Sequence, residues 1–288
     1  MISIDYGWIG KWSTRVRTSA PRATISTWPS SKSSITSAAN YVSSQGSVCW
    51  TLVVAGAASS FTRQNISAPA PRESPQANPQ AEWALSRIAE AGLGNEARIE
   101  LRDYREIATT SGFYDAIVSV GMAEHVGRER LPDYFTAAHR ALKPGGVFLN
   151  QAIAEDIIPR PGNPESFRGS FIEQYVFPDG DIPPLPIMLT AAESSGFEIR
   201  DVENLREHYA LTLRHWLGRL EAHHDEALRF VDEATYRAWR LYIAGSAHGF
   251  SYGHIAVYQT LLAKLDPSGE IKLPLTRDGW YAPKSLLL

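Results

Sequence analysis

YDAIVSVGMAEHVGRERLPDYFTAAHRALKPGGVFLN, the run from Tyr114 to Asn150, decides the fold class of this chain. It begins with a β-branched run at Ala116–Val120 that ends at a glycine, a pattern typical of a buried parallel strand whose carboxyl end opens onto a site. Apolar residues at helical spacing follow from Leu131 to Leu142, and Lys143–Gly146 is a Pro-Gly stop signal. A second strand is predicted at Val147–Ile153. Strand, helix and strand make one βαβ unit with a right-handed crossover, so the fold class is α/β.

Composition excludes several classes of protein. The chain has 288 residues, a net charge of −3 and no dense block of Lys and Arg, so we expect no nucleic-acid partner. A single cysteine, Cys49, excludes a disulfide framework and a multi-cysteine metal site, which indicates a reducing, cytoplasmic compartment. No stretch approaches the roughly 18 apolar residues of a spanning helix, so we expect at most peripheral contact with the inner membrane surface.

Six segments between Gln80 and Pro283 carry a family signature: QAEWALSRIAEAGL, IELRDYREI, IVSVGMAEHVG, ALKPGGVFL, FIEQYVFPDG and RLYIAGSAHGF. In this order they resemble the cyclopropane-fatty-acyl-phospholipid synthases and the related mycolic acid cyclopropane synthases, S-adenosylmethionine-dependent methyltransferases of lipid acyl chains. The resemblance implies a Rossmann-like class I methyltransferase sheet in a domain over residues 80–288, with a helical insert around residues 152–190 that shapes an acyl channel. It implies S-adenosylmethionine as cofactor and unsaturated phospholipid acyl chains as substrate.

The resemblance also implies a polar cluster inside the apolar cleft. In the family, methyl transfer to a cis double bond gives a carbocation, and a bound bicarbonate takes the methyl proton whose loss closes the three-membered ring. The family's carboxylate falls at Glu124 and its tyrosine at Tyr209, while Gln151 replaces a frequent histidine and Ser246 a late cysteine. Because glutamine carries no positive charge, its grip on an anion is weaker than that of histidine, and simple C-methylation is an alternative outcome.

The cofactor pocket is assigned by the same resemblance. Its adenine side is implied at Gln80 and at Arg102 and Asp103, the dipeptide near the end of IELRDY, with Asp103 accepting a hydrogen bond from the adenine amino group. Glycine permits a close approach of backbone to ligand. The residues expected beneath the methionine portion are Ser119, Val120 and Gly121.

Each assignment has a structural alternative. Glu124 could cap the helix that follows it, and Tyr209 could belong to the core face of an amphipathic helix. Asp103 could be a solvated turn residue. His223 and His224 look like part of a metal cluster, but adjacent histidines on a helix point in different directions, so a surface role is favoured and no metal site is predicted.

The first 79 residues differ in composition from the rest. Residues 1–79 hold one leucine, two acidic residues and sixteen serines, whereas residues 80–288 hold twenty-three leucines. Segments of this kind bury too little apolar surface to offset their ordering entropy. We therefore expect residues 1–79 to be disordered or poorly packed and the N-terminal strands of the sheet to be disrupted. An authentic organelle transit peptide is the alternative interpretation.

A change of reading frame accounts for this composition. The family's glycine-rich cofactor loop, LLDxGCGWG, is missing, and VCWTLVVAGA at Val48–Ala57 stands in its place. The alternative frame joins the third base of each codon to the first two bases of the next. In that frame the codons of Cys49 and Trp50 must give leucine, and those of Trp50 and Thr51 must give aspartate. The codons that follow permit the rest of the motif, so the shifted frame can encode LLDLGCGWG. The same phase permits family motifs at Ile9–Arg22 and Trp28–Ile35. We infer that about residues 8–79 are out of frame, which would impair cofactor binding and leaves a non-catalytic lipid-binding or interaction module as the alternative function.

Overall fold

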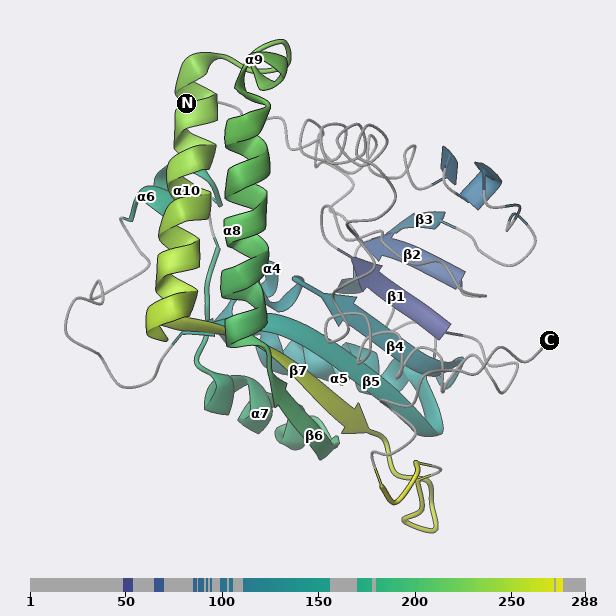
Figure 1. Ribbon diagram of the computed structural model, residues 1–288. Coiled ribbons are helices and arrows are strands. Elements are labelled where there is room, and N and C mark those ends of the chain that lie inside the picture. The colour runs from purple at the N-terminus through teal and green to yellow at the C-terminus, as the bar shows by residue number, and fades with distance from the viewer. Residues whose placement is uncertain are drawn as a thin grey trace.

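A single mixed sheet organises the protein (Figure 1). The computed structural model describes residues 49–53, 65–69, 85–86, 88–90, 92, 94, 99–102, 104–105, 111–155, 170–177, 180–271 and 273–276. Within these ranges the strands are β1 (Cys49–Val53), β2 (Asn65–Pro69), β3 (Ile99–Arg102), β4 (Tyr114–Val120), β5 (Leu142–Glu155), β6 (Glu198–Asn204) and β7 (Ile255–Ala263). Their order is β3-β2-β1-β4-β5-β7-β6. Neighbouring strands from β3 to β5 are parallel, whereas β7 runs antiparallel to β5 and β6.

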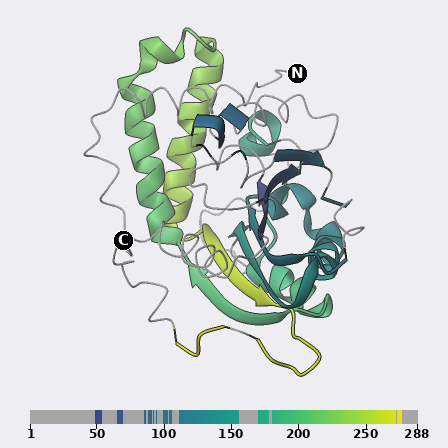
Figure 2. The same cartoon turned by 90° about the vertical axis from the view of Figure 1, so that its right-hand side faces the viewer.

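Helices cover both faces of this sheet. They are α4 (Ala123–Val126), the 3-10 turn η3 (Arg128–Arg130), α5 (Leu131–Ala141), α6 (Phe171–Tyr175), α7 (Leu185–Ser194), α8 (Arg206–Ala222), α9 (His224–Ala227) and α10 (Glu233–Tyr252). Helices α5 and α7 share one core with β4 and β5, and α8 and α10 form a second core. In Figures 1 and 2, α8 and α10 run side by side as a hairpin with α9 at its tip. None of the described helices is both long and apolar enough to cross a bilayer.

The predicted βαβ unit is present as β4, α5 and β5. Leu131, Tyr134 and Phe135 are buried against the sheet at the helical spacing that the sequence indicated, and a proline in the first turn suits the start of α5. The strand begins earlier than predicted, because Lys143–Gly146 lies within β5 instead of before it. At Gly146 an added Cβ would lie 2.9 Å from the Lys143 carbonyl oxygen, so only glycine permits this close backbone approach.

One expectation about the N-terminal region is wrong. The α/β class is confirmed, but β1 and β2 are not disrupted, since Cys49–Val53 pairs in parallel with β4 and also with Asn65–Pro69. A parallel ladder uses backbone groups alone, and the sequence Cys-Trp-Thr-Leu-Val suits a buried strand whatever loop follows it. The predictions for the remainder of residues 1–79 lie outside the described residues, as does the part of the expected insert over residues 156–169.

Candidate active site

Glu124 enters the site from the short helix α4, directly after the carboxyl end of β4. Its side chain reaches back to the neighbouring strand, where Oε1 accepts a hydrogen bond from the Ile153 backbone N–H at 2.7 Å. The other oxygen, Oε2, is buried and has no hydrogen-bond partner among the described residues. Burial raises the pKa of Glu124 to about 7, although the Ile153 hydrogen bond acts in the opposite direction. The carboxylate is therefore poised between its charged and neutral forms near neutral pH.

A chain of three polar side chains lies beside it, on the face of β5 that α8 covers. Gln259 Nε2 donates to Gln151 Oε1 at 2.7 Å, and Gln151 Nε2 donates to the Tyr209 hydroxyl oxygen at 2.9 Å. Because the phenol oxygen accepts from Gln151, the Tyr209 hydrogen is left to be donated elsewhere. Gln259 Oε1, like Glu124 Oε2, is buried without a partner in the described part of the chain.

Tyr209 remains a neutral phenol in this environment. Burial, followed by the nearby negative charge of Glu124, raises its pKa to about 12, and the hydrogen bond from Gln151 opposes this only in part. Its ring packs on Phe250 of α10, with the ring centroids 5.5 Å apart. Ser246 is buried one helical turn before Phe250, on the same face of α10.

The structure thus brings three of the four predicted catalytic side chains into one neighbourhood. Glu124 and Tyr209 interact electrostatically and Gln151 bonds Tyr209 directly, while Ser246 lies one helical turn before Phe250, whose ring packs on Tyr209. Glu124 lies in the first turn of α4, as the capping alternative requires, but α4 has no side-chain cap hydrogen bond and Glu124 Oε1 accepts from the Ile153 backbone of β5. Tyr209 does pack against the core of α8 and α10, so its aromatic ring is structural while its hydroxyl faces the polar chain.

The predicted cofactor residues are only partly described. Gln80 and Asp103 lie outside the described residues, and Arg102 is described only as the last backbone position of β3. Ser119 directs its hydroxyl to Tyr134 under α5, at 2.6 Å, so only its backbone is left for a ligand. At the end of β4, Gly121 follows Val120 with φ +67°, and none of the described residues comes within 4 Å of the position that a Cβ would occupy. This is the carboxyl edge of the parallel strands, where ligands bind in α/β sheets.

The suspected histidine cluster is a surface feature. His223 Nδ1 lies 2.9 Å from the Arg219 carbonyl oxygen, and His224 Nε2 lies 3.1 Å from Glu233 Oε2. The described residues contain no group of three or more His, Cys, Asp or Glu side chains that could hold a metal ion. Trp216 on α8 is 45% exposed, whereas Trp239 and Phe250 on α10 are buried.

Sequence reasoning missed Gln259 and Arg128. A glutamine within the apolar strand sequence IAVYQTLLA was a usable signal for Gln259, because a buried polar side chain requires a partner. Arg128 gave no such signal, since its partner Asp181 lies 53 positions away.

Comparison with known proteins adds family evidence to this geometry. The family model of mycolic acid cyclopropane synthetases matches residues 76–260. The chain is 36% identical over 204 residues to a probable fatty acid methyltransferase of Mycobacterium tuberculosis, covering 71% of this chain and 46% of the relative. It is 38% identical over 203 residues to a probable fatty acid methyltransferase of Pseudomonas putida, covering 70% and 51%. The chain therefore spans about half the length of these curated relatives.

A solved structure shows the same similarity. Mycolic acid cyclopropane synthase CmaA1, complexed with SAH and CTAB, superposes with a TM-score of 0.64 at 26% identity. The superposition covers 76% of this chain and 78% of that one. Sequence and structure thus point to the same group of proteins.

Proposed function

This chain belongs to the mycolic acid cyclopropane synthetase family, and from that membership we propose that it transfers a methyl group from S-adenosylmethionine to the double bond of an unsaturated phospholipid acyl chain. One observation carries the proposal: a buried carboxylate, Glu124, with a pKa of about 7 and one oxygen unpartnered in the described part of the chain, lies beside a neutral tyrosine at the carboxyl edge of the sheet. The similarity to two probable fatty acid methyltransferases supports an acyl substrate. Such a substrate resides in the bilayer, so we place the reaction at the inner membrane surface, reached from the cytoplasm.

The described residues fit the methyl donor at one point. No described residue comes within 4 Å of a Cβ placed on Gly121, as a ligand that passes close to the backbone requires, and the related CmaA1 structure holds SAH. S-adenosylmethionine, when bound, supplies the methyl group. The loop after β1 lies outside the described residues, and its sequence holds one glycine, Gly56, in place of the family's glycine-rich turn. We therefore expect weak cofactor binding, and calorimetry that gives a low-micromolar affinity would contradict this.

The chain's own residues then act on the acyl group. Glu124, in its charged form, stabilises the acyl carbon that becomes positive after methyl transfer, and its carboxylate accepts the proton whose loss leaves a neutral product. Tyr209 stays neutral and offers one hydroxyl hydrogen toward the site. The apolar packing of Tyr209 on Phe250 keeps out water, which would otherwise capture a carbocation.

Bicarbonate does not fit the described residues. A buried anion needs several hydrogen-bond donors, whereas the described polar chain offers the Tyr209 hydroxyl hydrogen, and the unpartnered Gln259 Oε1 and the charged form of Glu124 Oε2 are acceptors. Gln151 also lacks the positive charge of the family's frequent histidine, and its amide is engaged on both sides. We therefore assign the proton transfer to Glu124 and no step to bicarbonate.

The same neutral Gln151 favours a second product. If no group holds a base close to the transferred methyl, the proton can leave from the acyl chain instead, which gives a methylated chain without a ring. The similarity to probable fatty acid methyltransferases agrees with this simple C-methylation. The two outcomes differ in which hydrogen is lost.

The experiment uses vesicles of a monounsaturated phosphatidylglycerol and S-adenosylmethionine with a deuterated methyl group, supplied at millimolar concentration to offset weak binding. Mass spectrometry of the released fatty acids then counts the label. A ring product keeps two deuterium atoms, whereas simple methylation with proton loss from the chain keeps three. Absence of label at saturating cofactor, with vesicle binding retained, would overturn the proposed reaction and favour a non-catalytic lipid-binding module. Glu124→Gln is the control for enzyme-dependent labelling.

A further inference from the structure

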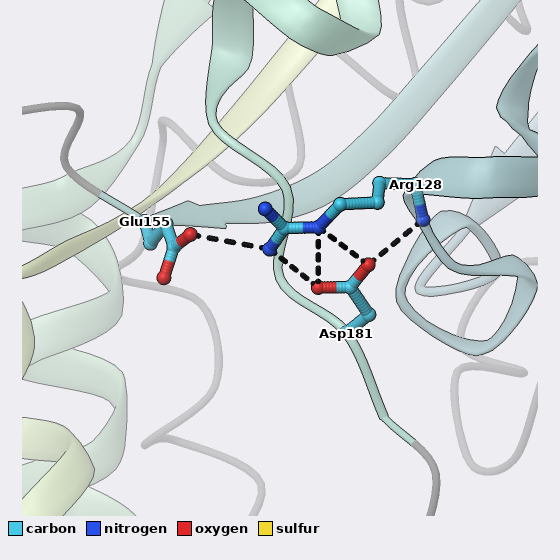
Figure 3. Close-up of polar contacts among 3 residues, drawn as sticks. All are labelled: Arg128, Glu155 and Asp181. Carbon is cyan, nitrogen blue, oxygen red and sulfur yellow. Dashed lines mark hydrogen bonds and ion pairs between the residues drawn. The ribbon is translucent and has the colours of Figure 1, made fainter. Parts of the chain in front are cut away.

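Arg128, four residues after Glu124 in the chain, forms an ion pair with the distant Asp181 (Figure 3). Arg128 Nη2 donates to Asp181 Oδ1 at 2.7 Å and Arg128 Nε donates to Asp181 Oδ2 at 2.9 Å. The Arg128 backbone N–H also donates to Asp181 Oδ2, at 2.8 Å. Glu155 Oε1 lies 3.3 Å from Nη2 and completes the group. Two parallel bonds from a planar guanidinium to one carboxylate fix direction as well as distance.

The pair joins three segments around the carboxylate of the proposed reaction. Arg128 begins η3, directly after the helix that carries Glu124, whereas Glu155 ends β5 and Asp181 lies on the segment before α7. The Asp181 backbone N–H donates to the Glu124 carbonyl oxygen at 2.9 Å. Asp181 therefore holds the main chain of Glu124 on one side and the guanidinium of Arg128 on the other.

Helix α4 and the turn η3 that follows it are both fastened to β5. Glu124 Oε1 accepts from the Ile153 backbone N–H at 2.7 Å, and Arg128 reaches Glu155 two positions further along that strand. Helix α4 has only four residues and no side-chain cap, and a helix of one turn is not stable alone. Contacts from outside must hold it: Ala123 and Val126 are buried in the core, and the polar contacts of Glu124, Arg128 and Asp181 add direction to that packing.

The Arg128–Asp181 pair is better explained as holding Glu124 in place than as setting the pKa of Glu124 or stabilising the fold. The guanidinium is occupied by two carboxylates, Asp181 and Glu155, and the high pKa of Glu124 arises from burial. The Arg128 side chain is 46% exposed, and ion pairs at such positions contribute only about 0–1 kcal/mol to folding. Removal of the pair should leave a folded protein whose Glu124 is less firmly placed.

We infer that Arg128 and Asp181 are positioning residues, which hold the Glu124 carboxylate against the end of β5 in the geometry that proton transfer requires. This inference rests on the proposed function for its effect on turnover. The effect of the Arg128–Asp181 pair on the placement of Glu124 can be measured without any turnover. The positioning role and the proposed function can therefore fail separately.

The test compares Arg128→Gln and Asp181→Asn with Arg240→Gln, a matched control that breaks the exposed Arg240–Glu221 ion pair at 2.7 Å on the α8–α10 hairpin. We expect kcat to fall about 10- to 100-fold in the first two variants, as misplacement of a reacting group by about 1 Å can cost 10²-fold, with KM for lipid within about threefold. The control should keep the kcat of the parent, and all three variants should melt within a few degrees of one another. The charge-swapped double variant Arg128→Asp/Asp181→Arg should recover part of the loss.

The second readout is the titration of Glu124, followed by infrared spectroscopy with Glu124→Gln as the reference for band assignment. In Arg128→Gln and Asp181→Asn we expect the Glu124 midpoint to move at least one pH unit toward that of an exposed glutamate, since a loosened helix admits water. If the parent transfers no methyl group but the Glu124 midpoint still shifts in the two variants, the positioning role is supported and only the proposed function is overturned. An unshifted midpoint, or a loss confined to melting temperature, overturns the positioning role.

Discussion

The two faces of β5 carry polar networks of opposite character. Asn150 and Gln151 are adjacent, so their side chains project to opposite sides of the sheet. Under α5, the Tyr134 hydroxyl lies 2.6 Å from Ser119 Oγ and 2.9 Å from Asn150 Oδ1, and each of these polar groups has a partner. Under α8, the chain from Gln259 through Gln151 ends at Tyr209, which interacts electrostatically with Glu124, and Glu124 Oε2 has no partner among the described residues.

The difference separates a structural network from a reactive one. Buried polar groups are normally satisfied, and a closed network stabilises a single packing arrangement. An open network costs stability and persists where a ligand or a proton completes it. Both faces hold a tyrosine whose pKa is raised by burial and, to a smaller extent, by the charge of Glu124, so the contrast lies in hydrogen bonding.

The largest expected effect comes from Glu124→Gln. It removes the carboxylate whose pKa of about 7 lets it take a proton on the α8 side of β5, the open face. General-base catalysis contributes about 10²- to 10⁴-fold, and we expect a loss of kcat in that range, measured as labelled fatty acid per minute. Glu193→Gln, on the exposed surface of α7, is the matched control and should keep full activity. A Glu124→Gln variant with more than a tenth of parental turnover would show that the open face is not the reactive one.

The same residue makes stability depend on pH. Glu124 has a pKa of about 7 in the folded chain and 4.5 as its reference, so the folded state retains a proton that the unfolded state releases. The free energy of unfolding should therefore fall as pH rises from 4.5 to 7 and then level off, by about 3 kcal/mol in total. Urea unfolding of the parent and of Glu124→Gln at several pH values measures this difference. Parallel stability curves for the two proteins would contradict it.

On the α5 side of β5, the closed face, a substitution should affect stability and not turnover. Tyr134→Phe leaves Asn150 Oδ1 without its donor in a buried site, and we expect a loss of about 1–3 kcal/mol in unfolding free energy with kcat per folded molecule unchanged. Tyr209→Phe is the matched change on the open face, and it should lower kcat with a smaller loss of stability because Tyr209 is less buried. Equal effects of the two substitutions on both quantities would remove the distinction between the faces.

The sequence predicted the part of this contrast that depends on local pattern. Strand, helix and strand at Tyr114–Glu155 follow from periodicity, and Glu124, Gln151 and Tyr209 follow from family motifs. Gln259 could not be placed from sequence, because its contact with Gln151 depends on the antiparallel register of β5 and β7 across 108 residues. The error over β1 arose because side-chain composition was taken as a guide to a ladder that only backbone groups form.

Gln259 gives the smallest expected effect. Gln259→Met leaves Gln151 Oε1 without its donor but also removes Gln259 Oε1, which had no partner, so one unsatisfied acceptor replaces another. The unfolding free energy should change by less than about 1 kcal/mol. Turnover should fall a few-fold, since Gln151 then turns more freely and orients the Tyr209 hydroxyl less well.

Thr260 supplies the matched control for this substitution. It is the next residue along β7, and its hydroxyl donates to the Asn150 carbonyl oxygen at 3.1 Å, at the next position of β5. Thr260→Val should therefore cost about 1 kcal/mol of stability without a change in kcat. If Gln259→Met instead lowers stability by several kcal/mol at unchanged turnover, the Gln259–Gln151–Tyr209 chain is structural, and the open face reduces to Glu124 alone.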